Sequence, residues 1–320
     1  MAWRFLAVVF VLGLGCGDDD GDDMDASLGR PDAPGGGADN DTNVGLDAAT
    51  LDAAADAPIL DAALSDAALS DSGAPDISPA DASTPLRMPP VNGRLDYQLG
   101  GDYAPPVGVN VISRDRLGRP APGLYNICYV NGYQVQPGEV NDWEEDLVLR
   151  DSRGEPIIDP EWDEAILDIS SEDRRRRIAV VVGGWIEQCA RDGFDAIEID
   201  NLDTYSRVDG RISEDDAVSF MALLSTRAHG LGVAIAQKNS AEILSRRAEM
   251  GTDFVVVEEC ERYRECGDFI DVYGEFVLMI EYRTQDFERS CAALADTHAI
   301  VLRDLQLVTP DSRRYVYDDC

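Results

Sequence analysis

Gly193-Phe-Asp-Ala-Ile-Glu-Ile-Asp-Asn-Leu-Asp-Thr-Tyr205 is the stretch of sequence that decides the fold. Its segment 196–199 is rich in apolar and β-branched residues, which is typical of a short buried strand. Asp200, Asn201 and Asp203 follow without a spacer. Barrel enzymes carry their chemistry at the carboxyl ends of parallel strands. The stretch therefore predicts a barrel strand that presents Asp200 at the open end.

Two further segments have the same form. Val233-Ala-Ile-Ala-Gln-Lys-Asn239 is an apolar run that ends in Lys238, the only lysine of the chain, and in Asn239. Phe254-Val-Val-Val257 is a third apolar run, and it ends in Glu258. Polar groups thus gather at the ends of successive predicted strands.

The wider pattern predicts one α/β domain. Short apolar runs separated by amphipathic segments are typical of a parallel sheet covered by helices. Eight predicted strands in about 220 residues indicate a (β/α)8 TIM barrel. The predicted strands are 107–112, 124–129, 165–169, 196–200, 233–237, 254–258, 276–282 and 299–303. The predicted helices include 174–191, 214–229, 241–249 and 286–295.

The ends of the predicted strands together predict an active site at the open end of the barrel, which we call the mouth. Ionisable or phenolic groups end seven of the predicted strands: Tyr129, Asp168, Asp200, Lys238, Glu258, Glu281 and Asp304. One such acid alone would be an ordinary solvated carboxylate. Clustered carboxylates repel one another, which pushes one of them toward its neutral form. A neutral acid beside an ionised one is the arrangement that cleavage of a glycosidic bond requires.

Lys238 allows two interpretations. A lysine inside a barrel mouth can form a Schiff base, which would make the protein a lyase or an aldolase. With so many acids nearby, the interpretation that we favour is an ion pair that orients a carboxylate or contacts substrate. Several aromatic residues could stack on sugar rings or pack in the core: Tyr129, Trp143, Trp162, Tyr205, Tyr263 and Tyr282.

The first 16 residues predict an export signal. Arg4 precedes an apolar run from Phe5 to Leu14, which is too short for a permanent membrane span. Gly15-Cys16 then suggests lipoprotein processing, with a lipid on Cys16, and an ordinary signal peptide is the alternative. Because Gly17 rather than Asp follows Cys16, we expect the exported protein to be anchored at the outer membrane.

Residues 17–85 predict a disordered acidic linker. The segment holds seventeen Asp, no Glu and one Arg, and it has no aromatic residue. Asp recurs near every fifth position from Asp47 to Asp81, a period that matches neither a helix nor a strand. Such a chain buries too little apolar surface to offset its conformational entropy. The folded domain is therefore expected over residues 86–320.

Charge and cysteine content narrow the function. The net charge of −35 argues against nucleic acid as a partner. No CxxC pair is present and the chain has only two histidines, so we expect no metal. Six cysteines remain in the exported domain, an even number that favours disulfides but allows 15 pairings. They are Cys128, Cys189, Cys260, Cys266, Cys291 and Cys320.

An ordered series of short motifs resembles a known family. The series is Cys128-Tyr129, Leu167-Asp168-Ile169, Gly193-Phe-Asp195, Asp200-Asn-Leu-Asp203 with Tyr205, Ala228-His-Gly-Leu231, Lys238-Asn239, Glu258-Glu-Cys260 with Glu265-Cys266, and Glu281-Tyr282. Together these motifs resemble glycoside hydrolase family 114, whose members are endo-α-1,4-polygalactosaminidases with a TIM-barrel fold. The resemblance covers nearly all of residues 86–320.

The resemblance implies an endo-acting enzyme that hydrolyses a partly deacetylated, cationic galactosamine polysaccharide without a cofactor. It implies that Asp200 is the nucleophile and Glu258 the acid/base. It also implies a cleft lined by Tyr129, Asp168, Asn201, Asp203, Tyr205, Lys238, Asn239, Glu281 and Tyr282. We expect a monomer. A barrel that binds glycan without cleaving it is the alternative.

Overall fold

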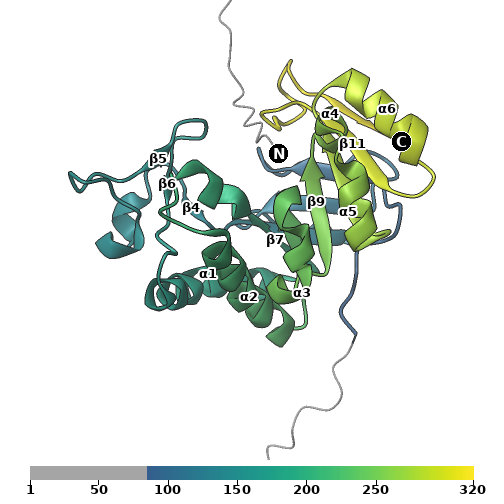
Figure 1. Cartoon of the computed structure of the whole chain (residues 1–320). Coiled ribbons are helices and arrows are strands. Elements are labelled where there is room, and N and C mark those ends of the chain that lie inside the picture. Colours follow the sequence, from purple (N-terminus) through teal and green to yellow (C-terminus); the bar gives the residue numbers. More distant parts are fainter. Residues whose placement is uncertain (1–84) are drawn as a thin grey trace, which may run out of the picture. The chain divides into compact units, whose positions relative to one another are not determined.

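The computed structural model describes residues 85–320, which form a barrel-like sheet (Figure 1). Eight parallel strands lie in the order β1-β2-β3-β7-β8-β9-β10-β11, and β12 continues the sheet antiparallel to β11. The strands are β1 (Leu95–Gln98), β2 (Val111–Asp115), β3 (Tyr125–Asn131), β7 (Ala196–Asp200), β8 (Ala234–Lys238), β9 (Phe254–Glu258), β10 (Val277–Glu281), β11 (Ala299–Arg303) and β12 (Tyr317–Asp319). The predicted (β/α)8 fold is thus confirmed. The predicted signal peptide, Cys16 and almost all of the predicted linker lie outside the described residues.

Alternate residues of each strand fill the inside of the barrel. Because side chains of a strand point to opposite faces in turn, every second residue meets the same interior. Leu95 and Tyr97 of β1, Phe254 of β9, Ile280 of β10 and Val301 of β11 are all buried in one interior cluster. The barrel is therefore a packed core, and its chemistry is confined to the strand ends.

Side chains, rather than backbone pairing, close the sheet between β1 and β11. The guanidinium of Arg303 lies 3.0 Å from the carboxylate of Asp96 and also donates to the backbone carbonyl of Tyr97. Asp96 accepts further hydrogen bonds from Gln98 at 2.6 Å and from the Tyr103 hydroxyl at 2.9 Å. Arg303 and Asp96 are both fully buried. We call these five residues the seam.

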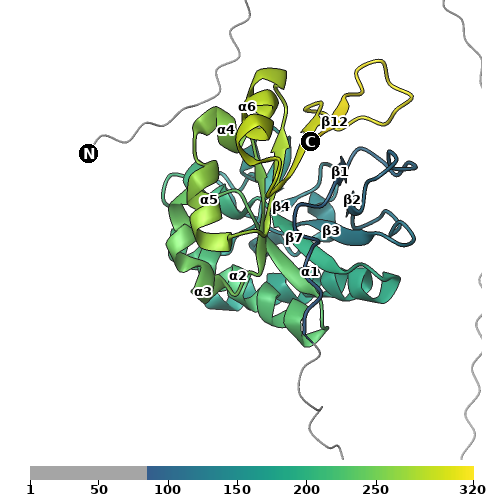
Figure 2. The same ribbon diagram turned by 90° about the vertical axis from the view of Figure 1, so that its right-hand side faces the viewer.

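Helices cover only part of the barrel. The α-helices are α1 (Glu172–Asp192), α2 (Glu214–Gly230), α3 (Arg247–Met250), α4 (Cys260–Tyr263), α5 (Cys266–Tyr273) and α6 (Thr284–Leu294). Short 3-10 turns are η1 (Val140–Asp142), η2 (Glu145–Leu147), η3 (Leu202–Arg207) and η4 (Ala241–Arg246). Loops without a helix join β1 to β2 and β2 to β3. In Figure 2, β1, β2 and β12 accordingly lie on the side that faces away from α3 and α5.

The two longest helices begin where the sequence provides caps. The Ser171 side chain accepts from the backbone of Arg174 at the start of α1, and Gly193 ends that helix with φ 96°. Ser213 and Asp216 form a reciprocal capping box at the start of α2. These caps place α1 and α2 against β3, β7 and β8, over a second apolar core. No helix among residues 85–320 is long and apolar enough to cross a membrane.

One predicted barrel strand is wrong. Segment 165–169 overlaps β6 (Glu164–Ile166), which belongs to a separate small sheet with β4 (Gln134–Val135) and β5 (Ile158–Asp159). Figure 1 shows this small sheet beside the barrel. The eighth barrel strand is β1, which a search for continuous apolar runs misses because Asp96 and Gln98 interrupt its apolar residues. The seam satisfies those polar groups inside the protein.

All six predicted cysteines form disulfides. The pairs are Cys128–Cys189, Cys260–Cys266 and Cys291–Cys320. Cys128–Cys189 joins β3 to α1, and Cys291–Cys320 joins α6 to the last residue of the chain. The prediction that the cysteines form disulfides is confirmed, and the structure selects one of the fifteen pairings that the sequence left open.

Candidate active site

Asp200 ends β7 and is held from three directions. The Tyr129 hydroxyl donates to its Oδ2 at 2.7 Å, and the backbone N–H of Asn201 donates to its Oδ1 at 2.8 Å. The Lys238 ammonium lies 3.3 Å from the same Oδ1. The side chain keeps 20% of its surface exposed. Its orientation is therefore fixed while one edge stays open to a ligand.

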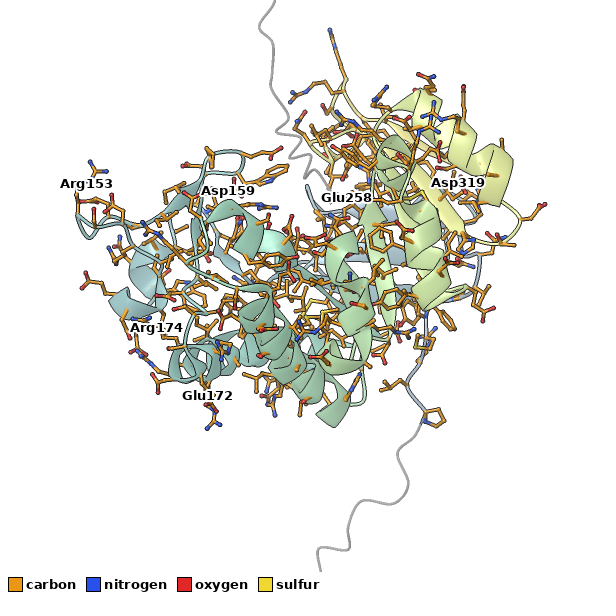
Figure 3. The ribbon with its side chains drawn as sticks, viewed as in Figure 1. Arg153, Asp159, Glu172, Arg174, Glu258 and Asp319 are labelled. Carbon is orange, nitrogen blue, oxygen red and sulfur yellow. A yellow bond between two sulfur atoms is a disulfide. The ribbon has the colours of Figure 1, made fainter. Side chains whose placement is uncertain are left out.

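Glu258 ends β9 and is held in a comparable way. The Tyr282 hydroxyl donates to its Oε1, and the Asn239 amide donates to its Oε2 at 3.3 Å. Asn239 also accepts from the backbone N–H of Glu258 at 2.8 Å. The side chain is 25% exposed. In Figure 3, Glu258 lies at the upper end of the barrel, on the same side of the molecule as Asp159 of the small sheet.

Lys238 lies between the two carboxylates. Its Nζ is 3.3 Å from Asp200 and 3.1 Å from Glu258, and only 2% of the side chain is exposed. Beneath it, Glu198 lies 3.4 Å from the same nitrogen and is fully buried. The ammonium of Lys238 thus lies within ion-pair distance of three carboxyl groups. We call Asp200, Lys238, Glu258 and Glu198 the mouth cluster.

Two hydroxyls support the deepest acid of this cluster. Tyr97 donates to one oxygen of Glu198 at 2.6 Å, and Ser113 donates to the other at 2.8 Å. Tyr97 also lies 3.1 Å from the Lys238 nitrogen. Residues of β1, β2, β7 and β8 therefore converge below the two exposed carboxylates and fix Lys238 in place.

The charges in the mouth cluster shift the pKa values in opposite directions. Burial acts to raise the pKa of Asp200, but Lys238 and the Tyr129 hydrogen bond outweigh it and hold the pKa below the ordinary value. Burial acts to lower the pKa of Lys238, but Asp200, Glu258 and Glu198 raise it well above the ordinary value. Burial raises the pKa of Glu198. Asp200 is therefore an anion and Lys238 a cation at neutral pH.

A left-handed backbone follows each functional strand end. Asn201, Asn239 and Glu259 have φ values of 64°, 46° and 54°, directly after Asp200, Lys238 and Glu258. Non-glycine residues adopt this conformation rarely, and such strain gathers at functional sites. The sharp turn ends each strand at the residue that the site uses.

Several predicted site residues make contacts elsewhere. The expectation that Asp168 ends a barrel strand is wrong, because it follows β6 of the small sheet. Its carboxylate accepts from Ser170 at 2.5 Å and pairs with Arg174 at 2.9 Å, where α1 begins. Asp304 accepts from the backbone of Val308 at 3.1 Å, so it holds the loop after β11.

Asp203 and Tyr205 lie in η3, beyond Asp200. Asp203 makes a two-point contact with Arg207 at 2.8 and 2.9 Å. The Tyr205 hydroxyl donates to Glu242 at 2.5 Å. Their predicted contact with substrate stays a prediction, and it requires a ligand that extends from Asp200 over η3.

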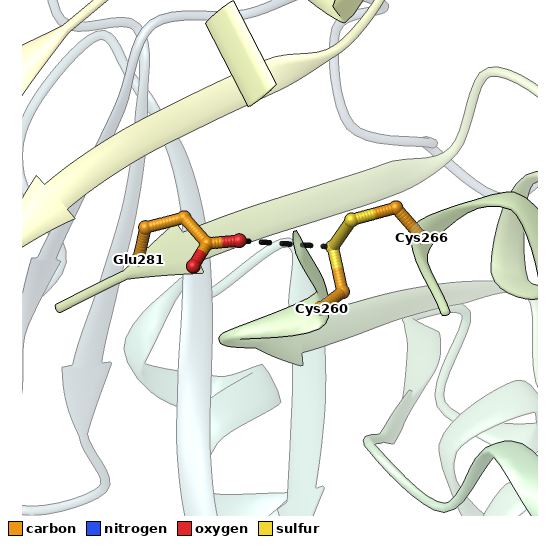
Figure 4. Close-up of side chains that lie close together, drawn as sticks. All are labelled: Cys260, Cys266 and Glu281. Carbon is orange, nitrogen blue, oxygen red and sulfur yellow. Dashed lines mark hydrogen bonds between the residues drawn. A yellow bond between two sulfur atoms is a disulfide. The ribbon is translucent and has the colours of Figure 1, made fainter. Parts of the chain in front are cut away.

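Glu281 lies behind the mouth rather than in it. Its Oε1 accepts from the backbone N–H of Glu261 at 3.0 Å, and its Oε2 is buried without a hydrogen-bond partner among residues 85–320. Figure 4 shows Oε1 directed at the sulfur of Cys260, 3.9 Å away. Glu281, Cys260 and Cys266 have the spacing of a metal site. The two sulfurs are joined in a disulfide, however, so neither is a thiolate ligand.

The predicted aromatic residues fall into two groups. Trp143 is buried and packs edge-to-face on Trp185, with ring centroids 5.8 Å apart. Trp162 and Tyr263 are 49% and 44% exposed, so their rings are accessible to a sugar. Burial raises the pKa of the Tyr263 hydroxyl, and the adjacent Arg262 acts to lower it.

Sequence reasoning missed the residues that lie deepest. Glu198 precedes Asp200 by two positions on one strand, so the period of two residues places both side chains on the same face. That signal was available. Ser113, Asn131 and Glu164 gave no such signal, because their roles come from contacts between distant strands.

Comparison with known proteins gives the family of the chain and structures of similar fold. The family model described as glycoside-hydrolase family GH114 matches residues 76–320. Ega3 of Aspergillus fumigatus, solved as a complex with galactosamine, is 19% identical, with a TM-score of 0.61 over 75% of this chain and 100% of that one. The glycoside hydrolase domain of PelA from Pseudomonas aeruginosa is 13% identical, with a TM-score of 0.47 over 70% and 97% of the two chains. No curated protein matches the chain.

Fold and family together define the class as a glycoside hydrolase built on a (β/α)8 barrel. The chain belongs to glycoside-hydrolase family GH114. The match begins at residue 76, ten residues before the predicted boundary of the folded domain, and that boundary stays a prediction.

Proposed function

We propose that the protein is an endo-acting hydrolase of α-1,4-linked galactosamine polysaccharide, with Asp200 as nucleophile and Glu258 as acid/base. The observation that carries the proposal is the position of Lys238 between the two carboxylates. Because their nearest oxygens lie 3.3 and 3.1 Å from one nitrogen, these oxygens are at most about 6.4 Å apart. Retaining glycosidases separate their carboxyl groups by about 5–5.5 Å and inverting ones by about 6.5–9.5 Å. This limit on the nearest oxygens allows the retaining spacing, and we propose a retaining reaction.

The electrostatics favour this division of roles. A nucleophile must be ionised, and Lys238 and Tyr129 keep Asp200 in that form. Glu258 would protonate the leaving oxygen while Asp200 attacks the anomeric carbon, and it would then activate the water that hydrolyses the glycosyl-enzyme. Lys238 would hold the two groups at a fixed distance through both steps.

The substrate part of the proposal rests on family and charge. The family is GH114, and the similar structure Ega3 was solved with galactosamine bound. The net charge of −35 and the excess of carboxyls over cations in the mouth cluster suit a cationic amino sugar. We also propose export of the protein with a lipid on Cys16, which the three disulfides of the described domain support.

The charge on Lys238 weighs against the lyase or aldolase interpretation. Attack on a carbonyl needs a neutral amine. The pKa of Lys238 lies well above its ordinary value, and the amine is surrounded by three carboxyl groups. No observation favours that chemistry over the two-carboxylate reaction.

The test is incubation of the protein with partly deacetylated α-1,4-galactosaminogalactan and, in parallel, with chitosan, with released oligomers measured by mass spectrometry. We expect oligomers from the first polymer only, and their loss in Asp200→Asn and Glu258→Gln. Binding of the polymer without release of oligomers would instead support a glycan-binding barrel. Full hydrolysis by Asp200→Asn would overturn the proposed pair.

A further inference from the structure

Glu164 is a buried acid that neither the motifs nor the proposed mechanism uses. It begins β6 of the small sheet, yet its side chain contacts the ends of β3 and β7. Its Oε2 accepts from the Asn131 amide at 2.8 Å and from the Asn201 amide at 3.5 Å. The residue is only 9% exposed.

The second oxygen of this carboxyl is free. Among residues 85–320, Oε1 of Glu164 has no hydrogen-bond or ion-pair partner, and it is not among the polar atoms sealed from solvent. The nearby cation, Arg207, is bound by Asp159 at 2.6 Å and by Asp203 at 2.8 Å. Glu164 is thus a held carboxyl with one accessible oxygen and no cation of its own.

Negative charge surrounds that oxygen. Burial, together with the charges of Asp200 and Asp159, raises the pKa of Glu164 to about 7, although Asn131 and Arg207 act to lower it. The carboxyl of Glu164 therefore titrates near neutral pH in the unliganded protein. A cation placed at Oε1 would stabilise the ionised form and bind more tightly as a result.

Glu164 also lies close to the bond-cleaving groups. Asn201, which follows Asp200 in the chain, donates to Asn131 at 2.9 Å, and Asn131 in turn donates to Glu164. The charge of Glu164 acts on the Tyr129 hydroxyl that holds Asp200. A sugar that contacts Asp200 therefore brings its substituents within reach of Glu164.

We infer that Glu164 binds the ammonium group of a deacetylated amino-sugar unit beside Asp200, and so selects deacetylated over N-acetylated units. The inference rests on the proposed function, because it requires an amino-sugar ligand at the mouth. An acetamido group carries no charge, so it leaves the Glu164 carboxylate without a counter-ion. A purely structural Glu164 would join the small sheet to the barrel and would affect both kinds of sugar equally.

The test is calorimetric binding of two trisaccharides, α-1,4-linked galactosamine and its fully N-acetylated form, to the full chain carrying Glu258→Gln. Adding Glu164→Gln keeps an acceptor oxygen for Asn131 and removes the charge. We expect affinity for the amine to fall at least about tenfold, as for loss of a charge-assisted hydrogen bond, and affinity for the N-acetylated form to change less than about twofold. Glu161→Gln removes an exposed charge from the same segment and serves as the matched control, with no change expected.

The pH dependence separates recognition from structure. With Glu164 present, the preference for the amine should shrink as the pH falls below about 7, because the carboxyl becomes neutral. With Glu164→Gln, that dependence should disappear. Equal loss of both ligands, no loss of either, or an equal loss in Glu161→Gln would overturn the inference.

The inference and the proposed function fail separately. If the wild-type chain cleaves no polymer but Glu164→Gln loses binding of the amine, the inference stands and hydrolysis is rejected. Cleavage of the polymer with unchanged amine preference in Glu164→Gln would keep hydrolysis and overturn the inference.

Discussion

The seam and the mouth cluster are both buried groups of charged residues, but their charges are balanced differently. In the seam, Arg303 pairs with the fully buried Asp96 at 3.0 Å and lies 3.9 Å from Asp304 at its edge, and the remaining polar atoms bind Gln98, Tyr103 and backbone carbonyls. In the mouth cluster, one lysine meets three carboxyls, two of which reach solvent. One cluster is complete by itself, and the other lacks positive charge.

The difference separates stability from function. A buried ion pair whose hydrogen bonds are all made resists disruption, because removal of one partner leaves the other charge uncompensated. A cluster with excess negative charge and open oxygens has shifted pKa values and can accept a cationic ligand. Changes in the seam should therefore lower stability, and changes in the mouth cluster should lower activity.

The largest effect should come from Glu258→Gln. Loss of a general acid typically slows a reaction by about 10²–10⁴-fold. The side chain is partly exposed, and glutamine can still form hydrogen bonds with Tyr282 and Asn239. The stability, measured as the urea midpoint, should therefore not change. Steady-state hydrolysis and urea denaturation measure the two quantities. A large loss of stability would place Glu258 with the seam.

Arg303→Met should have the opposite effect. The change leaves Asp96 buried without a cation, and breaking such a pair costs about 3–5 kcal/mol of unfolding free energy. The kcat of the remaining folded protein should be close to that of the wild type. Arg191→Met removes an exposed ion pair with Glu187 and is the matched control, with a cost below about 1 kcal/mol. Equal costs in the two variants would show that the seam does not close the barrel.

Lys238→Met tests whether charge sets the acidity of Asp200. Without the ammonium, burial would dominate and raise the pKa of Asp200, by about 1–3 units for loss of an adjacent opposite charge. The acidic limb of the kcat/KM profile should then move to higher pH. Lys238→Arg keeps the charge and should leave the limb near its wild-type position. An unmoved limb in Lys238→Met would mean that another group controls ionisation.

Glu281→Gln tests whether burial alone, without an ion pair, makes a carboxyl lower the unfolding free energy. Burial raises the pKa of Glu281 to about 7, above the ordinary value of 4.5. The unfolded chain therefore loses its proton first as the pH rises, so the unfolding free energy falls between about pH 4.5 and 7 and the full loss is present at pH 8. Glu281→Gln should be about 3 kcal/mol more stable than the wild type at pH 8, and close to it at pH 4. Denaturation at both pH values measures this, and a variant less stable at pH 8 would contradict it.

The strands of the mouth could be predicted because their signals are local. Segments 196–200 and 254–258 agree with β7 and β9 to the residue, and Asp200, Lys238, Glu258, Tyr129, Asn239 and Tyr282 come together as expected. An apolar run followed directly by a polar residue is visible without knowledge of the tertiary structure.

The rest depends on contacts between distant segments. The burial of Asp96 in β1 could not be predicted, because its partner Arg303 lies more than 200 positions away in the chain. Segment 165–169 reads as a barrel strand because pattern alone cannot tell which sheet a short apolar run joins. The position of Glu164 near Asp200 could not be predicted, because it depends on hydrogen bonds from Asn131 and Asn201 in other segments of the chain.

The most direct test of the central claim is chemical rescue of two glycine variants by azide. Asp200→Gly and Glu258→Gly would each be given an aryl glycoside of α-1,4-linked galactosamine trisaccharide, and the anomer of the glycosyl azide would be read by NMR. We predict the inverted β-azide from Asp200→Gly, because azide replaces the nucleophile. We predict the retained α-azide from Glu258→Gly, because azide attacks the glycosyl-enzyme formed at Asp200. The reversed pattern, or no rescue of either variant, would contradict the account.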